Sequence, residues 1–329
     1  MEDSGRTDHA KLSVVQIGLN TADLPGTLRL YSELFGFANA GANAFWGEPS
    51  AIQGLGPDTR GVMWWLVGRQ NFFQLELFQH TVPRPKLQAA DWTPCDHGWV
   101  RFGVAVTDFD RALAVLGRWR IDSLAPVTYI NGLRRLGFRD PFVGTIVEIL
   151  EDGPALLGGV RPRSFNVDPA IVYVTSSVSE LEPALRFYED VVGLEIVDRE
   201  LLHDPSHEAL WGLAGAELDG FAARAGDIFI EVVCYRKPTG RPKDPAYCIA
   251  DQGIMNIALG SRSVPLVRDA LVRIRQAGIR TGVEFGEGEM LAAFALDPGR
   301  EVEFIALAAS LDSAVGFSPN VPFFCAPKI

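Results

Sequence analysis

The chain has 329 residues, a net charge of −11 and a hydrophobic fraction of 47%. This length allows two ordinary domains with large cores, and the composition is that of a folded protein. The negative charge argues against nucleic acid and anionic membranes as partners. The polar N-terminus lacks a signal-peptide core, no apolar run is long enough to span a membrane, and the four cysteines form no CxxC pair. These features predict a cytoplasmic protein.

The first part of the chain predicts a strand, a helix and then further strands. Residues 13–19 are apolar enough for a strand, and residues 24–35 carry apolar side chains at helical spacing. Two more strands are expected at 62–67 and 71–78. A shorter unit with the same order of elements follows at 97–151.

Four of the predicted strands carry a Glu in the middle of an apolar run. The four residues are Glu76, Glu148, Glu231 and Glu303. A lone carboxylate in such a run is costly unless it is paired or has a function. These residues are therefore the first candidates for a site.

The second half of the chain repeats the first. Glu76 and Glu231 are 155 positions apart, and so are Glu148 and Glu303. A tandem duplication is the simplest explanation. It predicts an α+β fold of four βαβββ modules, and the family resemblance described next implies that these modules pair into two half-open barrels. The predicted boundaries are a disordered tail at 1–12, an N-terminal barrel at 13–151 with modules 13–80 and 97–151, a linker at 152–169, a C-terminal barrel at 170–309 with modules 170–235 and 253–309, and a C-terminal tail at 310–329.

The repeated unit resembles the vicinal oxygen chelate superfamily. The stretches that carry the resemblance are Gln16-Ile-Gly-Leu, Arg101-Phe-Gly-Val, Tyr173-Val-Thr, Asn256-Ile-Ala-Leu and the four Glu strands. The resemblance implies that a metal is held by the first and last strands of the modules. It also implies one of several activities, because the superfamily includes extradiol dioxygenases, glyoxalase I-type isomerases and binding proteins without catalysis.

The ligand positions that the resemblance implies contain no histidine. The first-strand positions are Gln16, Arg101, Tyr173 and Asn256, and the last-strand positions are the four Glu. An extradiol dioxygenase needs two imidazoles and a carboxylate. In the N-terminal barrel, Arg101 predicts a structural ion cluster with Glu76, Glu148 and Gln16 in place of the metal. The alternative is that Arg101 anchors an anionic substrate.

The C-terminal barrel is the expected active site. Glu231 and Glu303 should converge there without a cation, beside Tyr173 and Asn256. Three outcomes are open: a divalent metal binds the two Glu, one Glu stays protonated as part of an acid–base pair, or a nearby Arg or His neutralises them.

Two histidines and two aromatic residues complete the predicted site. His203 and His207 lie in one loop, either exposed or folded over the barrel mouth, where His207 would be catalytic and His203 would bind substrate. Trp211 and Phe229 are candidates to line a cavity for a flat or apolar ligand.

The sequence thus predicts an enzyme that acts on a hydrophobic, aromatic small molecule by lyase-, isomerase- or hydrolase-like acid–base chemistry, as in aromatic compound catabolism. The alternatives are an extradiol dioxygenase with an atypical metal site and a non-catalytic protein that sequesters an aromatic metabolite or drug. The cofactor is open between none and one divalent metal, Fe or Mn. A homodimer is compatible with the apolar C-terminal tail.

Overall fold

A computed structural model describes residues 11–153, 156, 167–297 and 300–320 of the chain. Most of the predicted N-terminal tail, most of the predicted linker and the end of the C-terminal tail lie outside these residues.

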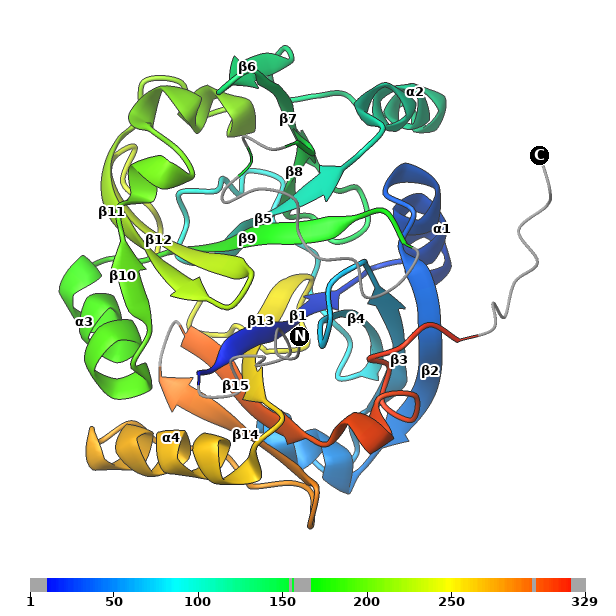
Figure 1. Cartoon of the computed structure of the whole chain (residues 1–329), viewed down its shortest axis with the longest axis vertical. Helices are drawn as coiled ribbons and strands as arrows, with labels where there is room; N and C mark the ends of the chain where they lie inside the picture. The colour runs from blue at the N-terminus through cyan, green and yellow to red at the C-terminus, as the bar shows by residue number, and fades with distance from the viewer. Residues whose placement is uncertain (1–10, 154–155, 157–166, 298–299, 321–329) are drawn as a thin grey trace, which may run out of the picture.

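The described part contains four modules, each of which starts with a strand and a helix (Figure 1). The first module comprises β1 (Ser13–Asn20), α1 (Leu24–Leu34), β2 (Ala38–Trp46), η1 (Glu48–Gln53), β3 (Arg60–Val67) and β4 (Gln74–Val82). The second comprises β5 (Gly98–Val106), α2 (Phe109–Trp119), β6 (Thr128–Ile130), β7 (Leu133–Arg139) and β8 (Ile146–Glu151).

The third module comprises β9 (Ala170–Ser177), α3 (Leu181–Arg186), η2 (Phe187–Val192), β10 (Glu195–Val197), η3 (Arg199–Leu201), η4 (Pro205–Trp211), β11 (Glu217–Ala225) and β12 (Ile228–Lys237). The fourth comprises β13 (Gly253–Ser261), α4 (Val264–Gln276), β14 (Met290–Asp297), β15 (Arg300–Leu307) and η5 (Ala309–Leu311). In this last module two isolated bridges, Thr281 with Ala295 and Phe285 with Ala292, stand where the other modules have a further strand.

Side chains cap the beginnings of α1 and α4. Asp23 accepts a hydrogen bond from the Gly26 amide at 3.0 Å, before α1. Ser263 accepts one from the Leu266 amide at 3.4 Å, before α4, as its position in the sequence predicts. Gly36, with a φ of 85°, follows α1 in the left-handed conformation that glycine adopts at low cost.

The strands form two curled, mixed sheets. The seven-stranded sheet has the order β14-β15-β13-β1-β4-β3-β2, and the eight-stranded sheet has the order β10-β11-β12-β9-β5-β8-β7-β6. The predicted α+β architecture of repeated modules in two half-barrels is therefore confirmed.

The expected pairing of neighbouring modules is wrong. β1 of the first module pairs antiparallel with β13 of the fourth, and β5 of the second pairs with β9 of the third. The inner pair of modules forms one sheet and the outer pair forms the other. The physical reason is that each module offers the same free edge, its first strand, so the repeat alone does not decide which edges meet.

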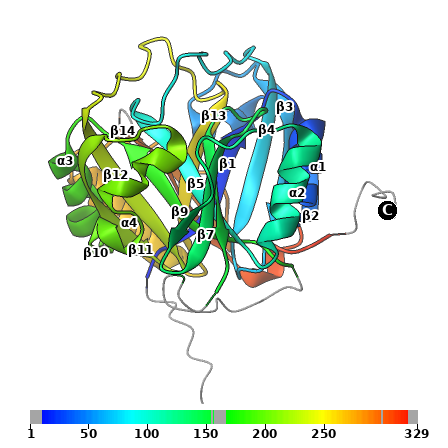
Figure 2. The ribbon, with the colours of Figure 1, turned by 90° about the horizontal axis from the view of Figure 1, so that it is seen from above.

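Alternation along the strands separates the apolar core from two polar faces. On β4, Leu75 and Leu77 are fully buried in the main core, whereas Gln74, Glu76 and Phe78 face the other way. Figure 2 shows α1 and α2 together on one side of the molecule and α3 and α4 together on the other. None of the helices in the described residues is long and apolar enough to cross a bilayer.

Candidate active site

The eight predicted ligand positions gather as two groups of four, one on the inner face of each sheet. We call these faces the first cup, which carries Gln16, Glu76, Asn256 and Glu303, and the second cup, which carries Arg101, Glu148, Tyr173 and Glu231. The predicted pair of Glu231 and Glu303 does not exist, because the two residues lie in different sheets. The predicted cluster of Arg101 with Glu76 and Gln16 is wrong for the same reason.

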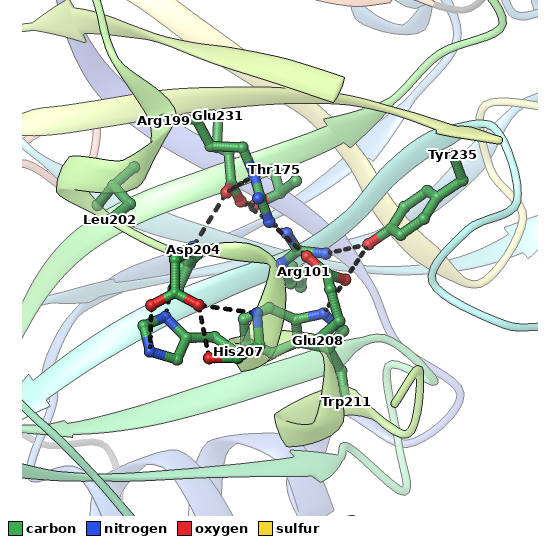
Figure 3. Close-up of polar contacts among 12 residues, drawn as sticks. Arg101, Thr175, Arg199, Leu202, Asp204, His207, Glu208, Trp211, Glu231 and Tyr235 are labelled. Atoms are coloured by element: carbon green, nitrogen blue, oxygen red, sulfur yellow. Dashed lines mark hydrogen bonds and ion pairs between the residues drawn. The ribbon is translucent and has the colours of Figure 1, made fainter. Parts of the chain in front are cut away.

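Glu231 is the centre of a buried ionic network in the second cup (Figure 3). Arg101 Nη2 lies 2.7 Å from Glu231 Oε2, and Arg199 Nε lies 2.8 Å from its Oε1. The Thr175 hydroxyl donates to the same carboxylate at 2.6 Å. Burial alone would raise the pKa of Glu231, but Arg101, His203 and Arg199 together hold it well below its ordinary value. These neighbours therefore favour the ionised form of Glu231.

His203 joins the two carboxylates of the second cup. Its Nδ1 lies 3.0 Å from Glu231 Oε1, and its Nε2 lies 3.1 Å from Glu148 Oε2. The Tyr173 hydroxyl donates to Glu148, and Arg135 lies 3.5 Å from the same carboxylate. Against the effect of burial, Arg135 and His203 keep the pKa of Glu148 lowered. Tyr173, predicted to orient a substrate, and His203, predicted to bind one, are thus held inside the network.

The segment from η3 to η4 covers this network. Glu208 on η4 bonds Arg199 and accepts hydrogen bonds at 2.6 Å from both Trp211 Nε1 and the Tyr235 hydroxyl. The Trp211 ring centroid lies 4.1 Å from the Arg101 guanidinium carbon, in a cation–π contact. The second cup is filled by its own side chains.

His207 and Phe229, the other predicted residues of this region, are held by contacts within the third module. His207 accepts a hydrogen bond from the Asp204 amide at 3.1 Å in a capping box, and burial lowers its pKa. Phe229 packs in a buried cluster that includes Tyr173 and Leu202. His203 and His207 do not reach Glu303, because Glu303 belongs to the first cup.

The first cup holds two carboxyls that hydrogen-bond to neutral groups. Gln16 Nε2 lies 2.6 Å from Glu76 Oε2 and 3.3 Å from Glu303 Oε2. Trp65 Nε1 donates to Glu76 Oε1 at 2.9 Å, and Asn256 Nδ2 donates to Glu303 Oε2 at 3.2 Å. No ion pair joins either carboxyl to Arg, Lys or His within the part of the chain that the structure describes.

Because no cation is paired with Glu76 or Glu303 among the described residues, the pKa of each carboxyl is raised. Burial raises the pKa of Glu76 to about 7. Burial, and then the charge of Glu76, raise the pKa of Glu303 to about 8. The pKa values of the two strand-centre Glu residues are therefore raised in the first cup and lowered in the second cup.

A cavity of about 190 Å³ lies over the two carboxyls of the first cup. Its walls come from η1, from the inner faces of β3, β4, β14 and β15, and from the segment after η5. The aromatic lining residues are Phe45, Trp65, Phe78, Phe285, Phe294 and Phe317. Phe285 is 46% exposed, which places the opening of the cavity near this residue. The sequence could have indicated Phe78, which is two residues from Glu76 on one strand, but nothing marked η1 as a wall.

In each sheet, a glycine on one central strand leaves space for a polar side chain of the neighbouring strand. Gly18 lies opposite Asn256 in the register of β1 and β13, and Gly103 lies opposite Tyr173 in that of β5 and β9. A Cβ at Gly103 would overlap the Tyr173 ring, and a Cβ at Gly18 would overlap Asn256 Oδ1.

Replacing Gly103 with Ala should lower the free energy of unfolding by about 1–3 kcal/mol, because the rigid Tyr173 ring has to move inside a packed network. Urea denaturation measures this change. Gly117, in α2, has no neighbour within 4 Å of an added Cβ, so Gly117→Ala should stabilise the protein by about 0.5–1 kcal/mol. Equal effects of the two substitutions would contradict the packing described.

The four central residues of the first cup do not fit the metal centre that the family resemblance implies. In the described residues no three His, Cys, Asp or Glu side chains converge on one point. The Asn256 amide turns its nitrogen to Glu303, whereas its oxygen lies against Gly18 without a hydrogen-bond partner. The Gln16 oxygen lies 2.9 Å from the Gln74 amide. Iron and zinc centres use imidazole or thiolate ligands, which this cup does not offer.

Solved structures share the architecture described above. A putative dioxygenase from Bacillus subtilis is 13% identical, the match covers 95% of this chain and 93% of that one, and the TM-score is 0.61. Glyoxalase I from Zea mays is 15% identical, with 91% of this chain and 95% of that one covered and a TM-score of 0.57. No family model and no curated protein matches the chain. The chain shares the fold of these solved structures, as the resemblance noted in the sequence implies.

Proposed function

We propose that the chain is an enzyme that moves protons to and from a small, largely apolar molecule in the first cup. The observation that carries this proposal is the pairing of Glu76 and Glu303, whose pKa values are about 7 and about 8, at the floor of an aromatic cavity. Near neutral pH such a pair holds roughly one proton, so it contains a base and an acid at once.

The hydrogen bonds favour a division of roles. Glu76 accepts N–H groups from Trp65 and Gln16, and both lower its pKa by stabilising the ionised form. It is therefore the general base that takes a proton from a substrate carbon or hydroxyl. Glu303 keeps its proton to higher pH and is the general acid that donates to a developing oxyanion. This chemistry is lyase- or isomerase-like.

Exchange of substrate hydrogens with solvent deuterium tests this function. The protein is incubated in D2O with a panel of single-ring aromatic ketones and hydroxyketones, and deuterium uptake is followed by mass spectrometry. Glu303→Gln should lower the exchange rate by about 10²–10⁴-fold, because the acid is lost while the fold is kept. Glu287→Gln removes the same charge from an exposed loop and should change the rate less than about twofold.

Two results would point to the other functions. Saturable binding of the same compounds without exchange or turnover would indicate a non-catalytic binding protein. Loss of the reaction after chelation, with recovery on addition of Mn²⁺, would indicate metal-assisted chemistry at Glu76 and Glu303. The ring-cleaving alternative depended on His203 or His207, and both lie in the second cup.

A further inference from the structure

The first cup presents hydrogen-bond acceptors that have no donor. Ser50 lines the cavity from η1 and is 2% exposed, and its Oγ has no hydrogen-bond partner among the residues described. Gln53 Oε1, on the same short helix, is also buried and unpaired there. A buried polar atom without a partner is unfavourable, so a ligand that forms a hydrogen bond with it is favoured. The missing partner of Gln53 Oε1 is a donor.

The first cup also lacks a positive charge. Glu76 and Glu303 lie close together, because Gln16 Nε2 is 2.6 Å from Glu76 Oε2 and 3.3 Å from Glu303 Oε2. Within the described residues, no Lys, Arg or His lines the cavity. In the second cup, Arg101 and Arg199 supply this charge from the chain itself. The first cup has the same carboxylates without the cation.

The rest of the lining is suited to an organic cation. Trp65, Phe45, Phe78, Phe294 and Phe317 all border the cavity. Aromatic faces attract an ammonium group through their quadrupoles, and several rings around one site form the cages that bind substituted amines. Such a ligand has a charged head and an apolar body. In this cup the carboxyls can bind the charged head, and the aromatic rings can pack against the apolar body.

We propose that the first cup takes a compact organic cation, an amine that is protonated at neutral pH and carried on a body of single-ring size. The ammonium N–H groups face Glu76, Glu303 and the oxygens of Ser50 and Gln53. This inference rests on the proposed function, because it names the substrate class of the same site. The size follows from the cavity, whose volume of about 190 Å³ is somewhat larger than that of an engineered cavity of ~150 Å³ that binds benzene.

A metal ion is the other possible source of positive charge, and the orientation of the amides disfavours it. A hard divalent cation takes six or more oxygen ligands. The Asn256 oxygen is turned toward Gly18, while its amide nitrogen donates to Glu303. An ammonium needs only acceptors on one side and rings on the other.

Isothermal titration at about pH 7.5 with three probes of equal size tests the proposal. Benzylamine is protonated at this pH, benzyl alcohol is neutral and benzoate is anionic. Benzylamine should bind at least about tenfold more tightly than benzyl alcohol, and benzoate should not bind. Repeating the titration in two buffers of different ionisation enthalpy should show release of a fraction of a proton, because the cation favours the ionised form of Glu76 while Glu303 keeps its proton.

Variants identify the groups responsible. Glu76→Gln and Glu303→Gln should each weaken benzylamine binding by about tenfold or more, whereas Glu287→Gln should change it by less than about twofold. Equal affinity for benzylamine and benzyl alcohol would overturn the proposal, and so would tight Mn²⁺ binding that benzylamine does not displace. If the cation preference is absent but Glu303→Gln still stops proton exchange, this inference fails and the proposed function stands. If the cation preference is present but Glu303→Gln leaves proton exchange unchanged, this inference stands and the proposed function fails.

Discussion

Replacing Arg101 with Met should lower the free energy of unfolding by about 3–5 kcal/mol, because it leaves a buried carboxylate without its closest cation. Arg101 and Glu231 are both fully buried, and their charged groups lie 2.7 Å apart. The substitution also removes the hydrogen bond from Arg101 Nη1 to the Tyr235 hydroxyl at 3.0 Å and the cation–π contact with Trp211. Urea denaturation followed by tryptophan fluorescence measures the loss.

A surface ion pair in the same sheet provides the control. Arg236 and Asp219 are also 2.7 Å apart, but both side chains are more than half exposed. Arg236→Met should therefore cost less than about 1 kcal/mol. Adding Glu231→Gln to Arg101→Met should recover part of the loss, because the unpaired charge is then absent. A double variant less stable than the sum of both single effects would contradict this account of the second cup.

The Glu303→Gln variant should make protein stability less dependent on pH between about pH 4.5 and pH 8. In the folded state the pKa of Glu303 is raised from 4.5 to about 8, so the folded state binds more protons than the unfolded state in this window. Its contribution to stability is complete below about pH 4.5 and is lost as the pH rises through about 8. Glutamine does not titrate, and the variant should be about 1–3 kcal/mol more stable than the wild type above this pH.

Thermal unfolding across this pH range checks the prediction. His80 titrates in the opposite direction, because burial lowers its pKa to about 4, but it contributes equally to both proteins and cancels in their difference. Glu287→Gln, on an exposed loop, should follow the wild-type curve. A parallel shift of the Glu303→Gln curve, with no change in its slope, would show that Glu303 is ionised throughout and would remove the basis for the acid–base pair.

The modules could be predicted from the sequence because their signals are local. The equal separations of the four Glu, the helical spacing after the first strand and the cap at Ser263 each depend on a few neighbouring residues. The alternation of Leu75, Glu76 and Leu77 is also local, and in the structure it places Glu76 on the face opposite to the apolar core.

The partners of each Glu could not be predicted in the same way. Pairing of β1 with β13 joins residues about 240 positions apart, and the competing edge, β5, offers a similar apolar strand. The predicted pair of Glu231 and Glu303 followed from an assumption about this pairing. Likewise, Arg199 and Glu208 lie in the short helices η3 and η4, whose sequences have no periodic pattern, so nothing in the chain marked them as the cover of the second cup.

The cytoplasmic location and the homodimer stay predictions. The sequence by itself determined that this protein has four related modules, each with a carboxylate aimed away from the core, because hydrophobic periodicity is a local property. Only the tertiary structure decided which carboxylates meet and which of them find a cation. The reason is electrostatic: the pKa of a buried carboxyl depends on charges within a few ångströms, and these come from distant parts of the chain. Arg101 therefore neutralises Glu231, whereas Glu76 and Glu303 face each other in the cavity.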